Sequence, residues 1–412
     1  MDYLVLLDRK FPYRTGESFL ENEINEIAQH FDRVLIYPSD PLRGEEPTRG
    51  IASPNVEVKV TNGTKTFKQA ASAMRVFENL SSSSEKGIRK LFDAYCLAEA
   101  RTLKKRIASD LEREHIGKND TVYVYSYWLY TTAIAACMLK SYFCSRGVTC
   151  VAFSRGHGFD VYEERRPLSF LPQRKRLLSE LDHVYVCSED GVRYLHDKYP
   201  AYSEKVSASY LGTYDHGLSV PSNSGRFRIV SCSRVIGLKR VDLIARALEL
   251  LEDSGLCLEW THLGGGEKFD ELCAVAAPLS WMRVDLCGAV PNSAVYEYYR
   301  NRGGDLFVNV SESEGLPVSI MEAISFGIPV VATAVGGTPE IVIDGVSGTL
   351  LDKDCTPEEL ATAIYSYATM CSCDLTILRE STRKLWEERY QAVENYRVFA
   401  ESAKALAGVV DE

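Results

Sequence analysis

The 412-residue chain has no long apolar run. No stretch approaches the roughly 18 consecutive apolar residues that a membrane-spanning helix needs. The first segment, MDYLVLLDRKFPYRTGE, has an apolar core of about five residues, too short for the hydrophobic region of a signal peptide. We therefore expect a cytoplasmic chain that attaches at most to the inner face of a membrane.

An excess of positive charge is also missing. The 47 Lys and Arg residues are outnumbered by 57 Asp and Glu, which gives a net charge of −10. This balance argues against a general nucleic-acid binder. The 12 cysteines are scattered, and the close pair Cys371 and Cys373 lacks the usual zinc spacing. We expect free or buried thiols in a reducing compartment and no metal site.

One segment departs from this acidic average. Between Lys65 and Arg106, ten Lys and Arg residues stand against four Asp and Glu, a local net charge of +6. The stretches Ala71–Leu80 and Gly87–Ile107 both have the pattern of helices with an apolar face. A basic amphipathic segment can lie on an anionic membrane surface. A solvated helical face would produce the same pattern, so both interpretations stay open.

Short apolar runs alternate with longer amphipathic stretches, which predicts parallel sheets covered by helices on both faces. In the first half, the expected strands are Tyr3–Asp8, Arg33–Tyr37, Thr121–Ser126, Val148–Ser154, His183–Cys187 and Val206–Tyr210, with a helix at Glu17–His30. In the second half, they are Phe227–Ser233, Leu258–Leu263, Arg283–Leu286, Asp305–Asn309, Pro329–Thr333 and Gly348–Leu351, with helical sequence from Leu378 to Ala407.

The two series are separated by Gly212 to Gly225, which is rich in Gly, Ser, Pro and Asn and has the composition of a linker. We therefore expect an α/β chain with two Rossmann-like, doubly wound domains. The expected divisions are a first domain over 1–212, a linker over 213–226, a second domain over 227–385, and a helical segment over 386–412 able to pack back on the first domain.

The most informative stretch is NVSESEGLPVSIMEAISFGIPVVATAVGGTPEIVIDGVSG, residues 309–348. A strand is expected to end near Asn309 and a helix to begin near Pro317, because proline suits the first helical turn. Gly327 is then expected to end the helix. Such a helix N-terminus presents free N–H groups and partial positive charge, and it is a natural phosphate site.

Two glutamates, Glu314 and Glu322, have seven residues between them in this stretch. Glu314 is expected in the loop before the helix, where the helix dipole favours a carboxylate. Glu322 is expected inside the helix on the same face as Ser319 and Phe326. Spacing alone leaves Glu322 open to interpretation as a solvated surface residue.

The second half resembles family 4 of the retaining glycosyltransferases. The spacing of Glu314 and Glu322, followed by FGIPVVAT and GGTPEIV, is similar to the family's nucleotide-sugar motif. Three further stretches resemble family segments in the family's order: SRVIGLKR at Ser233–Arg240, HLGGGE at His262–Glu267 and LCGAVPNSAVYEYY at Leu286–Tyr299. One glycine-rich turn would be unspecific, whereas the ordered set is specific.

The first half resembles the family less specifically. FPYRTGESFLENEI at Phe11–Ile24 is similar to its first loop and helix, and RGHGFDVYEERRPLSFLPQR at Arg155–Arg174 resembles members that build bacterial surface polysaccharides. The chain departs from the pattern at Ser233 and Arg240, where glycine is usual, and at Gly265, where an acidic residue is common. These departures leave phosphate contacts possible but make the donor harder to identify.

The resemblance implies a GT-B fold with the active site in a cleft between the domains. It assigns catalytic roles to His157, Arg234, Lys239 and Glu314, donor binding to Gly16, Gly264, Gly265, Val290, Leu316, Pro317, Val318 and Glu322, and an acceptor or cleft position to Asp160. The donor would bind mostly to the second domain and the acceptor mostly to the first.

These residue types suit such roles. Arg234 and Lys239 would neutralise the leaving diphosphate, Glu322 would bind the ribose and Glu314 the donor sugar. His157 would contact the sugar near the reacting carbon. The alternatives are ordinary surface cations, a structural histidine, a turn glycine at position 16 and, for Asp160, a turn cap.

We thus expect a retaining glycosyltransferase that uses a UDP- or GDP-sugar donor and a glycan or lipid-linked acceptor. It would need no cofactor and no metal, because paired cations can do a metal's electrostatic work. Two other classes remain: a nucleotide-sugar epimerase, which needs no acceptor, and a noncatalytic nucleotide-sugar-binding partner.

Overall fold

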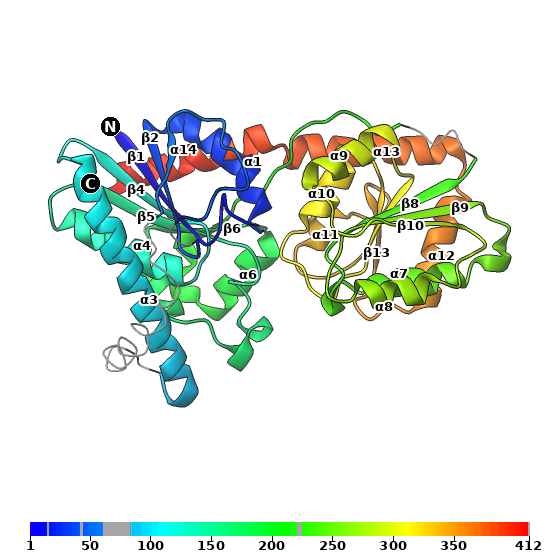
Figure 1. The fold of residues 1–412 in the computed structure, drawn as a ribbon, viewed down its shortest axis with the longest axis horizontal. Helices are drawn as coiled ribbons and strands as arrows, with labels where there is room; N and C mark the ends of the chain where they lie inside the picture. The colour runs from blue at the N-terminus through cyan, green and yellow to red at the C-terminus, as the bar shows by residue number, and fades with distance from the viewer. Residues whose placement is uncertain (15, 42–43, 61–82, 84, 221–224, 411–412) are drawn as a thin grey trace. The chain divides into compact units, whose positions relative to one another are not determined.

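The computed structural model describes residues 1–410 except 15, 42–43, 61–82, 84 and 221–224. The chain forms two compact units (Figure 1). The first unit combines Met1–Leu211 with Ala392–Glu412, and the second unit is Gly212–Gln391. The chain therefore returns to its first unit at its end, and each unit is described by itself below.

The first unit contains a parallel sheet of seven strands in the order β3-β2-β1-β4-β5-β6-β7. The strands are β1 (Asp2–Asp8), β2 (Arg33–Pro38), β3 (Val56–Val58), β4 (Thr121–Ser126), β5 (Thr149–Gly156), β6 (His183–Val186) and β7 (Val206–Ala208). All six strands expected in this half are present. The three-residue edge strand β3 was not expected, because it is too short to show a periodic pattern.

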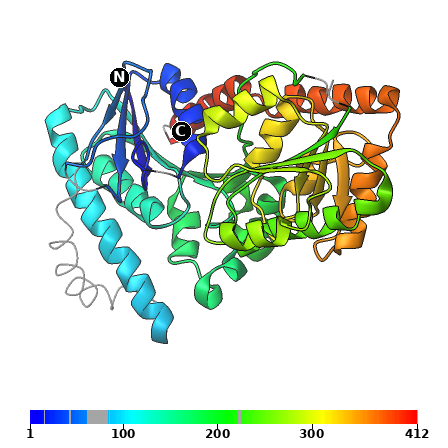
Figure 2. The ribbon, with the colours of Figure 1, turned by 45° about the vertical axis from the view of Figure 1, so that its right-hand side comes forward.

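Helices cover both faces of this sheet. They are α1 (Ser18–Ile27), α3 (Gly87–Leu111), α4 (Thr131–Cys144), α5 (Arg174–Glu180), α6 (Glu189–Lys198) and α14 (Ala392–Val410). The long helix α3, cyan in Figure 2, packs against α4. Val124 and Ala152 belong to the core on that face, whereas their neighbours Tyr125 and Phe153 contact Phe399 of α14 on the other. This alternation is the period-two pattern of a strand.

The second unit contains a parallel sheet of six strands in the order β10-β9-β8-β11-β12-β13. The strands are β8 (Phe227–Cys232), β9 (Leu258–Leu263), β10 (Arg283–Leu286), β11 (Leu306–Asn309), β12 (Val330–Thr333) and β13 (Gly348–Leu351). The helices are α7 (Val241–Glu249), α8 (Phe269–Ala276), α9 (Asn292–Asn301), α10 (Val318–Ser325), α11 (Thr338–Ile341), α12 (Pro357–Ala368) and α13 (Ser372–Arg389). Figure 1 shows α7, α8 and α12 on one face and α9, α10 and α13 on the other.

The helical sequence expected from Leu378 to Ala407 forms two helices, α13 and α14, with a break at Tyr390 and Gln391. Tyr390 is fully buried, and its hydroxyl donates to the Glu340 carbonyl at 2.8 Å. This contact holds the end of α13 on the second unit. The structural division therefore falls after Gln391, later than the expected boundary at residue 385.

The expected linker is partly attached to the second unit. The Thr213 N–H donates to the Tyr390 carbonyl at 3.0 Å, and the Ser219 N–H donates to the Phe326 carbonyl at 3.0 Å. The Trp386 indole also donates to the Thr213 hydroxyl at 2.8 Å. Gly, Ser and Pro composition therefore marks an irregular segment here, but one with specific partners.

Each sheet has a switch point, where the strand order reverses. It lies between β1 and β4 in the first unit and between β8 and β11 in the second. Ligands of such sheets bind outside the carboxyl ends of the strands at this point. Within the described residues, no helix is both long and apolar enough to cross a membrane. The expected helix Ala71–Leu80 lies outside the described residues.

Candidate functional site

In the second unit, the sequence-predicted residues follow three neighbouring strands. Arg234 and Lys239 follow β8, Gly264 and Gly265 follow β9, and Glu314 lies between β11 and α10. Because β9, β8 and β11 are adjacent and parallel, their loops emerge at the same edge of the sheet. The switch point of the second unit, between β8 and β11, lies at that edge.

Lys239 and Glu314 form an ion pair across this edge. The Lys239 Nζ lies 2.5 Å from the Glu314 Oε1, and the two side chains are 21% and 10% exposed. The Asn309 amide, at the end of β11, lies 3.4 Å from the same oxygen. The lysine is therefore held at the switch point with its charge already balanced by a carboxylate, and Arg234 adds an exposed guanidinium nearby in the same loop.

The turn that carries Lys239 depends on Arg240. This residue stands where the resembled family usually has glycine, and it adopts a φ of 46°, in the left-handed region that favours glycine. Its side chain compensates by donating from Nε to the Val310 carbonyl at 2.8 Å and from Nη2 to the Lys353 carbonyl at 2.6 Å. Arg240 is thus anchored to the scaffold.

The glycine turn after β9 packs closely against two other loops. A Cβ atom on Gly264 would lie 1.9 Å from the Ser233 carbonyl oxygen, and one on Gly265 would lie 2.8 Å from the Ala289 nitrogen. Val290, half-buried, follows Ala289 directly. These glycines therefore have a packing role that brings three backbone segments together.

Glu322 is inside α10 and is only 6% exposed, so the alternative of a solvated surface residue is wrong. The Tyr296 hydroxyl of α9 donates to its Oε1 at 3.1 Å. Burial raises the pKa of Glu322 to about 7, against the opposing effect of hydrogen bonds from Asn292 and Tyr296. A carboxyl group that titrates near neutral pH is typical of a functional site.

The helix expected near Pro317 begins at Val318, with Pro317 as its N-cap residue. No side chain caps this end, and Leu316 and Val318 are buried. The first N–H groups of a helix have no carbonyl partner within it. The N-terminus of α10 can therefore accept an anion. The helix ends at Ser325, with Phe326 as its C-cap residue, and the expected stop Gly327 follows with a φ of 70°.

Three residues that the sequence did not single out complete this region. Tyr296 holds Glu322, Asn309 contacts Glu314, and a Cβ atom on Gly336 would lie 2.1 Å from the Glu314 carbonyl oxygen. Gly336 belongs to the GGTPEIV stretch, so its position was visible as a motif. The other two depend on contacts between segments, which spacing does not reveal.

In the first unit, His157 follows β5, and its Nε2 lies 3.0 Å from the Tyr127 carbonyl oxygen, so Nε2 carries the proton and donates it. Burial, and then the charge of Arg155, lower the pKa of His157 to about 3. The imidazole is therefore neutral at pH 7.

Asp160 is fully buried and bound to backbone. Its Oδ1 accepts the His157 N–H at 2.8 Å, and its Oδ2 accepts the Leu129 N–H at 2.7 Å. The side chain thus ties the loop after β4 to the loop after β5. Gly16, which is exposed, has a φ of 116°, and Arg49 donates to its carbonyl at 2.7 Å.

No group of three or more His, Cys, Asp or Glu side chains is arranged to hold a metal ion in the described part of the chain. The charged side chains near the switch point of the second unit include Arg234, Lys239, Glu314 and Glu322. Cations of this kind can stabilise a leaving phosphate without a metal.

Comparisons with known proteins point to the same region. Residues 219–370 match the family model described as Glycosyl transferases group 1, so the second unit contains a domain of that group. The chain is 30% identical over 215 residues to the amylovoran biosynthesis glycosyltransferase AmsK of Erwinia amylovora, covering 50% of this chain and 52% of the relative. It thus spans about half the length of that relative.

A second relative extends further along the chain. The putative colanic acid biosynthesis glycosyltransferase WcaL of Escherichia coli is 24% identical over 282 residues, 66% of this chain and 68% of the relative. Among solved structures, Anabaena HepE in complex with UDP has a TM-score of 0.65 at 15% identity, covering 98% and 99% of the two chains. The galactosyltransferase WaaB has a TM-score of 0.66 at 14% identity, covering 97% and 99%. The two Rossmann-like domains have the GT-B fold.

Proposed function

We propose that this protein is a retaining glycosyltransferase that transfers a sugar from a nucleotide-diphosphate sugar to a glycan or lipid-linked glycan. The observation that carries the proposal is the Lys239–Glu314 pair at the switch point, within the region that matches the group 1 glycosyltransferases. The similarity to AmsK and WcaL supports a place in bacterial surface-polysaccharide synthesis.

In the proposed reaction, the nucleoside diphosphate leaves the sugar with an additional negative charge. Arg234, Lys239 and the N-terminus of α10 stabilise that charge as it develops. Leu316 and Val318 supply backbone N–H groups there. The departing phosphate helps to take the proton of the acceptor hydroxyl, which attacks on the same face of the sugar, so the anomeric configuration is retained. No covalent nucleophile takes part.

The two glutamates divide the donor between them. Glu322 accepts the ribose hydroxyls from its buried position beside Tyr296, with Gly264, Gly265 and Val290 around the nucleotide. Glu314 accepts hydroxyls of the donor sugar. His157 contacts that sugar as a neutral imidazole, and Gly16 lets the backbone approach the diphosphate or the acceptor. The donor is a UDP- or GDP-sugar, and the UDP complex of HepE supports the uracil form.

A membrane face is the proposed location of the acceptor. Helix α3 carries Lys104, Lys105 and Arg106, and each basic residue near an anionic surface contributes about 1 kcal/mol. We expect the protein to float with vesicles that contain anionic lipid, less so in added salt. Neutralising Lys105, which is exposed, should weaken this binding. A protein that stays off anionic vesicles at low salt would refute the membrane part alone.

The proposal is tested by incubation with UDP- and GDP-sugars and a panel of glycan and lipid-linked acceptors, with the product's anomeric proton observed by NMR. An α-linked donor should give an α-linked product and free nucleoside diphosphate. A β-linked product would refute retention. Release of an epimerised sugar from donor alone would identify an isomerase, and donor binding without turnover on any acceptor would identify a noncatalytic partner.

A further inference from the structure

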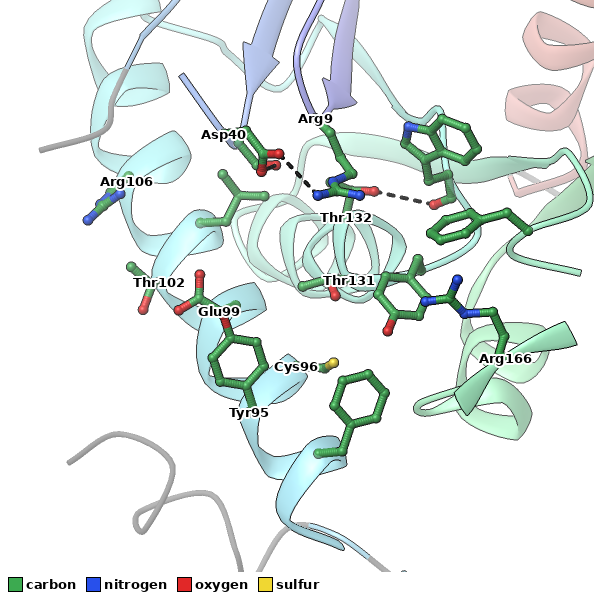
Figure 3. A pocket seen from close by; sticks show the side chains of 16 residues that line it. Arg9, Asp40, Tyr95, Cys96, Glu99, Thr102, Arg106, Thr131, Thr132 and Arg166 are labelled. Carbon is green, nitrogen blue, oxygen red and sulfur yellow. Dashed lines mark hydrogen bonds and ion pairs between the residues drawn. The ribbon is translucent and has the colours of Figure 1, made fainter. Parts of the chain in front are cut away.

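The first unit contains a cavity of about 340 Å³ at its own switch point (Figure 3). Its walls come from the ends of β1, β2 and β4, from α3, and from the loop after β5. Side chains that line it include Arg9, Asp40, Glu99, Trp128, Phe159 and Arg166. Ligand sites in proteins measure about 300–1,000 Å³, so this cavity suits one small ligand, of the size of a substituted sugar.

One wall of the cavity is aromatic. The rings of Trp128 and Phe159 meet edge to face with centroids 5.3 Å apart, and Tyr130 lies 5.8 Å from Phe159. Aromatic rings pack against the C–H face of a sugar ring, while its hydroxyl groups need polar partners at the sides. The cavity offers both kinds of surface.

The charges of the cavity are only partly compensated. Arg9 and Asp40 form an ion pair at 3.1 Å. The Arg166 guanidinium instead stacks on Phe159, 4.3 Å from the ring centroid. In the described part of the chain, neither Arg166 nor Glu99 has an oppositely charged side chain within 4 Å. Figure 3 shows Glu99 and Arg166 on different sides of the cavity, so the cavity can bind an anionic group and a hydroxyl donor separately.

The N-terminus of α4 adds to the positive side. Thr131 and Thr132, in the first turn of this 14-residue helix, line the cavity. The N-cap residue Tyr130 provides no side-chain hydrogen bond to the free N–H groups of that turn. The positive end of the helix dipole therefore faces the cavity and favours an anion there.

We propose that this cavity binds an anionic sugar residue of the acceptor. The phosphate or carboxylate of that residue contacts Arg166 and the first turn of α4, its ring packs on Trp128 and Phe159, and its hydroxyls donate to Glu99. This inference rests on the proposed glycosyl transfer and specifies the chemical class of its acceptor. Phosphate and carboxylate present the same anionic oxygens, and the two arms of the test distinguish them.

Trp128 provides a local reporter. It is the one tryptophan in residues 1–211, and the other three, Trp260, Trp281 and Trp386, belong to the second unit. The full chain is labelled with 5-fluorotryptophan, and the Trp128 resonance is assigned with Trp128→Phe. Glucose 1-phosphate, glucuronate and glucose are then titrated while the ¹⁹F shift of Trp128 is followed. Binding of a probe to the second unit instead is detected from the resonances of the other three tryptophans.

We expect at least one anionic probe to shift the Trp128 resonance and to bind about tenfold more tightly than glucose, the effect of one charge-assisted hydrogen bond. Arg166→Gln should remove this preference. Arg165→Gln is the matched control, because the Arg165 guanidinium stacks on Tyr162 at 3.6 Å and does not line the cavity.

Three results would overturn the inference: no probe shifts Trp128, glucose binds as tightly as both anions, or Arg166→Gln leaves the preference unchanged. If the protein transfers sugar but gives one of these three results, the cavity assignment is wrong and the proposed function stands. A chain that binds the anionic probe as described but transfers sugar from no donor would keep the cavity assignment and lose the proposed function.

Discussion

Two buried carboxylates of the first unit, Glu17 and Asp160, bind different kinds of partner from Glu314 and Glu322 of the second unit. In the first unit, Glu17 accepts the backbone N–H groups of Lys10 and Phe11 at 2.6 and 2.9 Å, and Asp160 accepts three further backbone N–H groups. In the second unit, Glu314 is paired with the side chain of a lysine, and Glu322 with a tyrosine hydroxyl.

This difference separates scaffold from binding residues. If a carboxylate that accepts backbone N–H groups moves away, those buried donors lose their acceptor, which costs about 1–3 kcal/mol for each donor. A carboxylate bound to a side chain can exchange that partner for a ligand, because the side chain can rotate to a new partner. We therefore expect substitutions at the first set to affect folding and those at the second set to affect the donor.

The largest effect is expected at Lys239. Lys239→Ala removes a cation that stabilises the leaving diphosphate. With the fold intact, kcat/KM should fall more than a hundredfold, which corresponds to a loss of about 3 kcal/mol in transition-state stabilisation. Arg234→Ala should act in the same direction. Lys384→Ala, an exposed lysine of α13 in the same unit, is the control. Near-normal turnover in both site variants would remove these cations from the mechanism.

The scaffold side of the comparison is tested at Asp160. Asp160→Asn replaces an acceptor oxygen by an NH₂ group beside a buried N–H, and we expect urea denaturation to show a loss of about 2 kcal/mol in the free energy of unfolding. Nucleotide affinity of the folded protein should not change. Asp197→Asn, on the exposed side of α6, is the matched control. An Asp160 variant of full stability would contradict its scaffold role.

The two glutamates of the second unit can be distinguished by calorimetry. Glu314→Gln should weaken binding of the nucleotide sugar by about 2 kcal/mol, the effect of losing a charged hydrogen-bond acceptor. Binding of the free nucleoside diphosphate should be nearly unchanged. Glu322→Gln should weaken both ligands, because both contain the ribose. If Glu314→Gln weakens the free nucleotide as strongly as the donor, the division of roles is wrong.

The smallest effect concerns pH. Because the pKa of Glu322 is raised to about 7, its carboxylate fraction increases about tenfold between pH 6 and pH 8, and affinity for UDP or GDP should rise accordingly. The free energy of unfolding has the opposite trend. The folded state favours the protonated acid of Glu322. The contribution of Glu322 to the free energy of unfolding is therefore complete below about pH 4 and is lost as pH rises through about 7.

The contribution of Glu322 to both pH trends should be absent in Glu322→Gln, whose side chain does not titrate. Measuring nucleotide affinity and urea stability for the two proteins at pH 6 and pH 8 separates the titration of Glu322 from that of the ligand phosphate. An identical pH dependence in the variant would show that another group is responsible.

The sequence predicted much of this fold for physical reasons. Buried parallel strands are short apolar runs, and these were visible at every strand except the three-residue β3. The break between α13 and α14 was not predicted, because the helical pattern continues across it and only the buried Tyr390 reveals it.

The site was only partly predictable. Glycine and proline at fixed offsets indicated the start and end of α10 and the turn after β9. The ion pair of Lys239 with Glu314 joins residues 75 positions apart, and spacing contains no information on it. The same holds for the burial of Glu322 and Asp160, and for the cavity of the first unit, whose walls come from distant segments.

Hydrogen exchange of the full chain with and without saturating UDP or GDP tests the central claim most directly, because it reports on each loop separately. We predict that one of the two nucleotides slows exchange in residues 234–240, 264–266 and 314–322, the loops at the switch point of the second unit. Lys239→Ala should weaken this protection. Unchanged exchange in all three loops at saturating concentrations of both nucleotides would contradict the account.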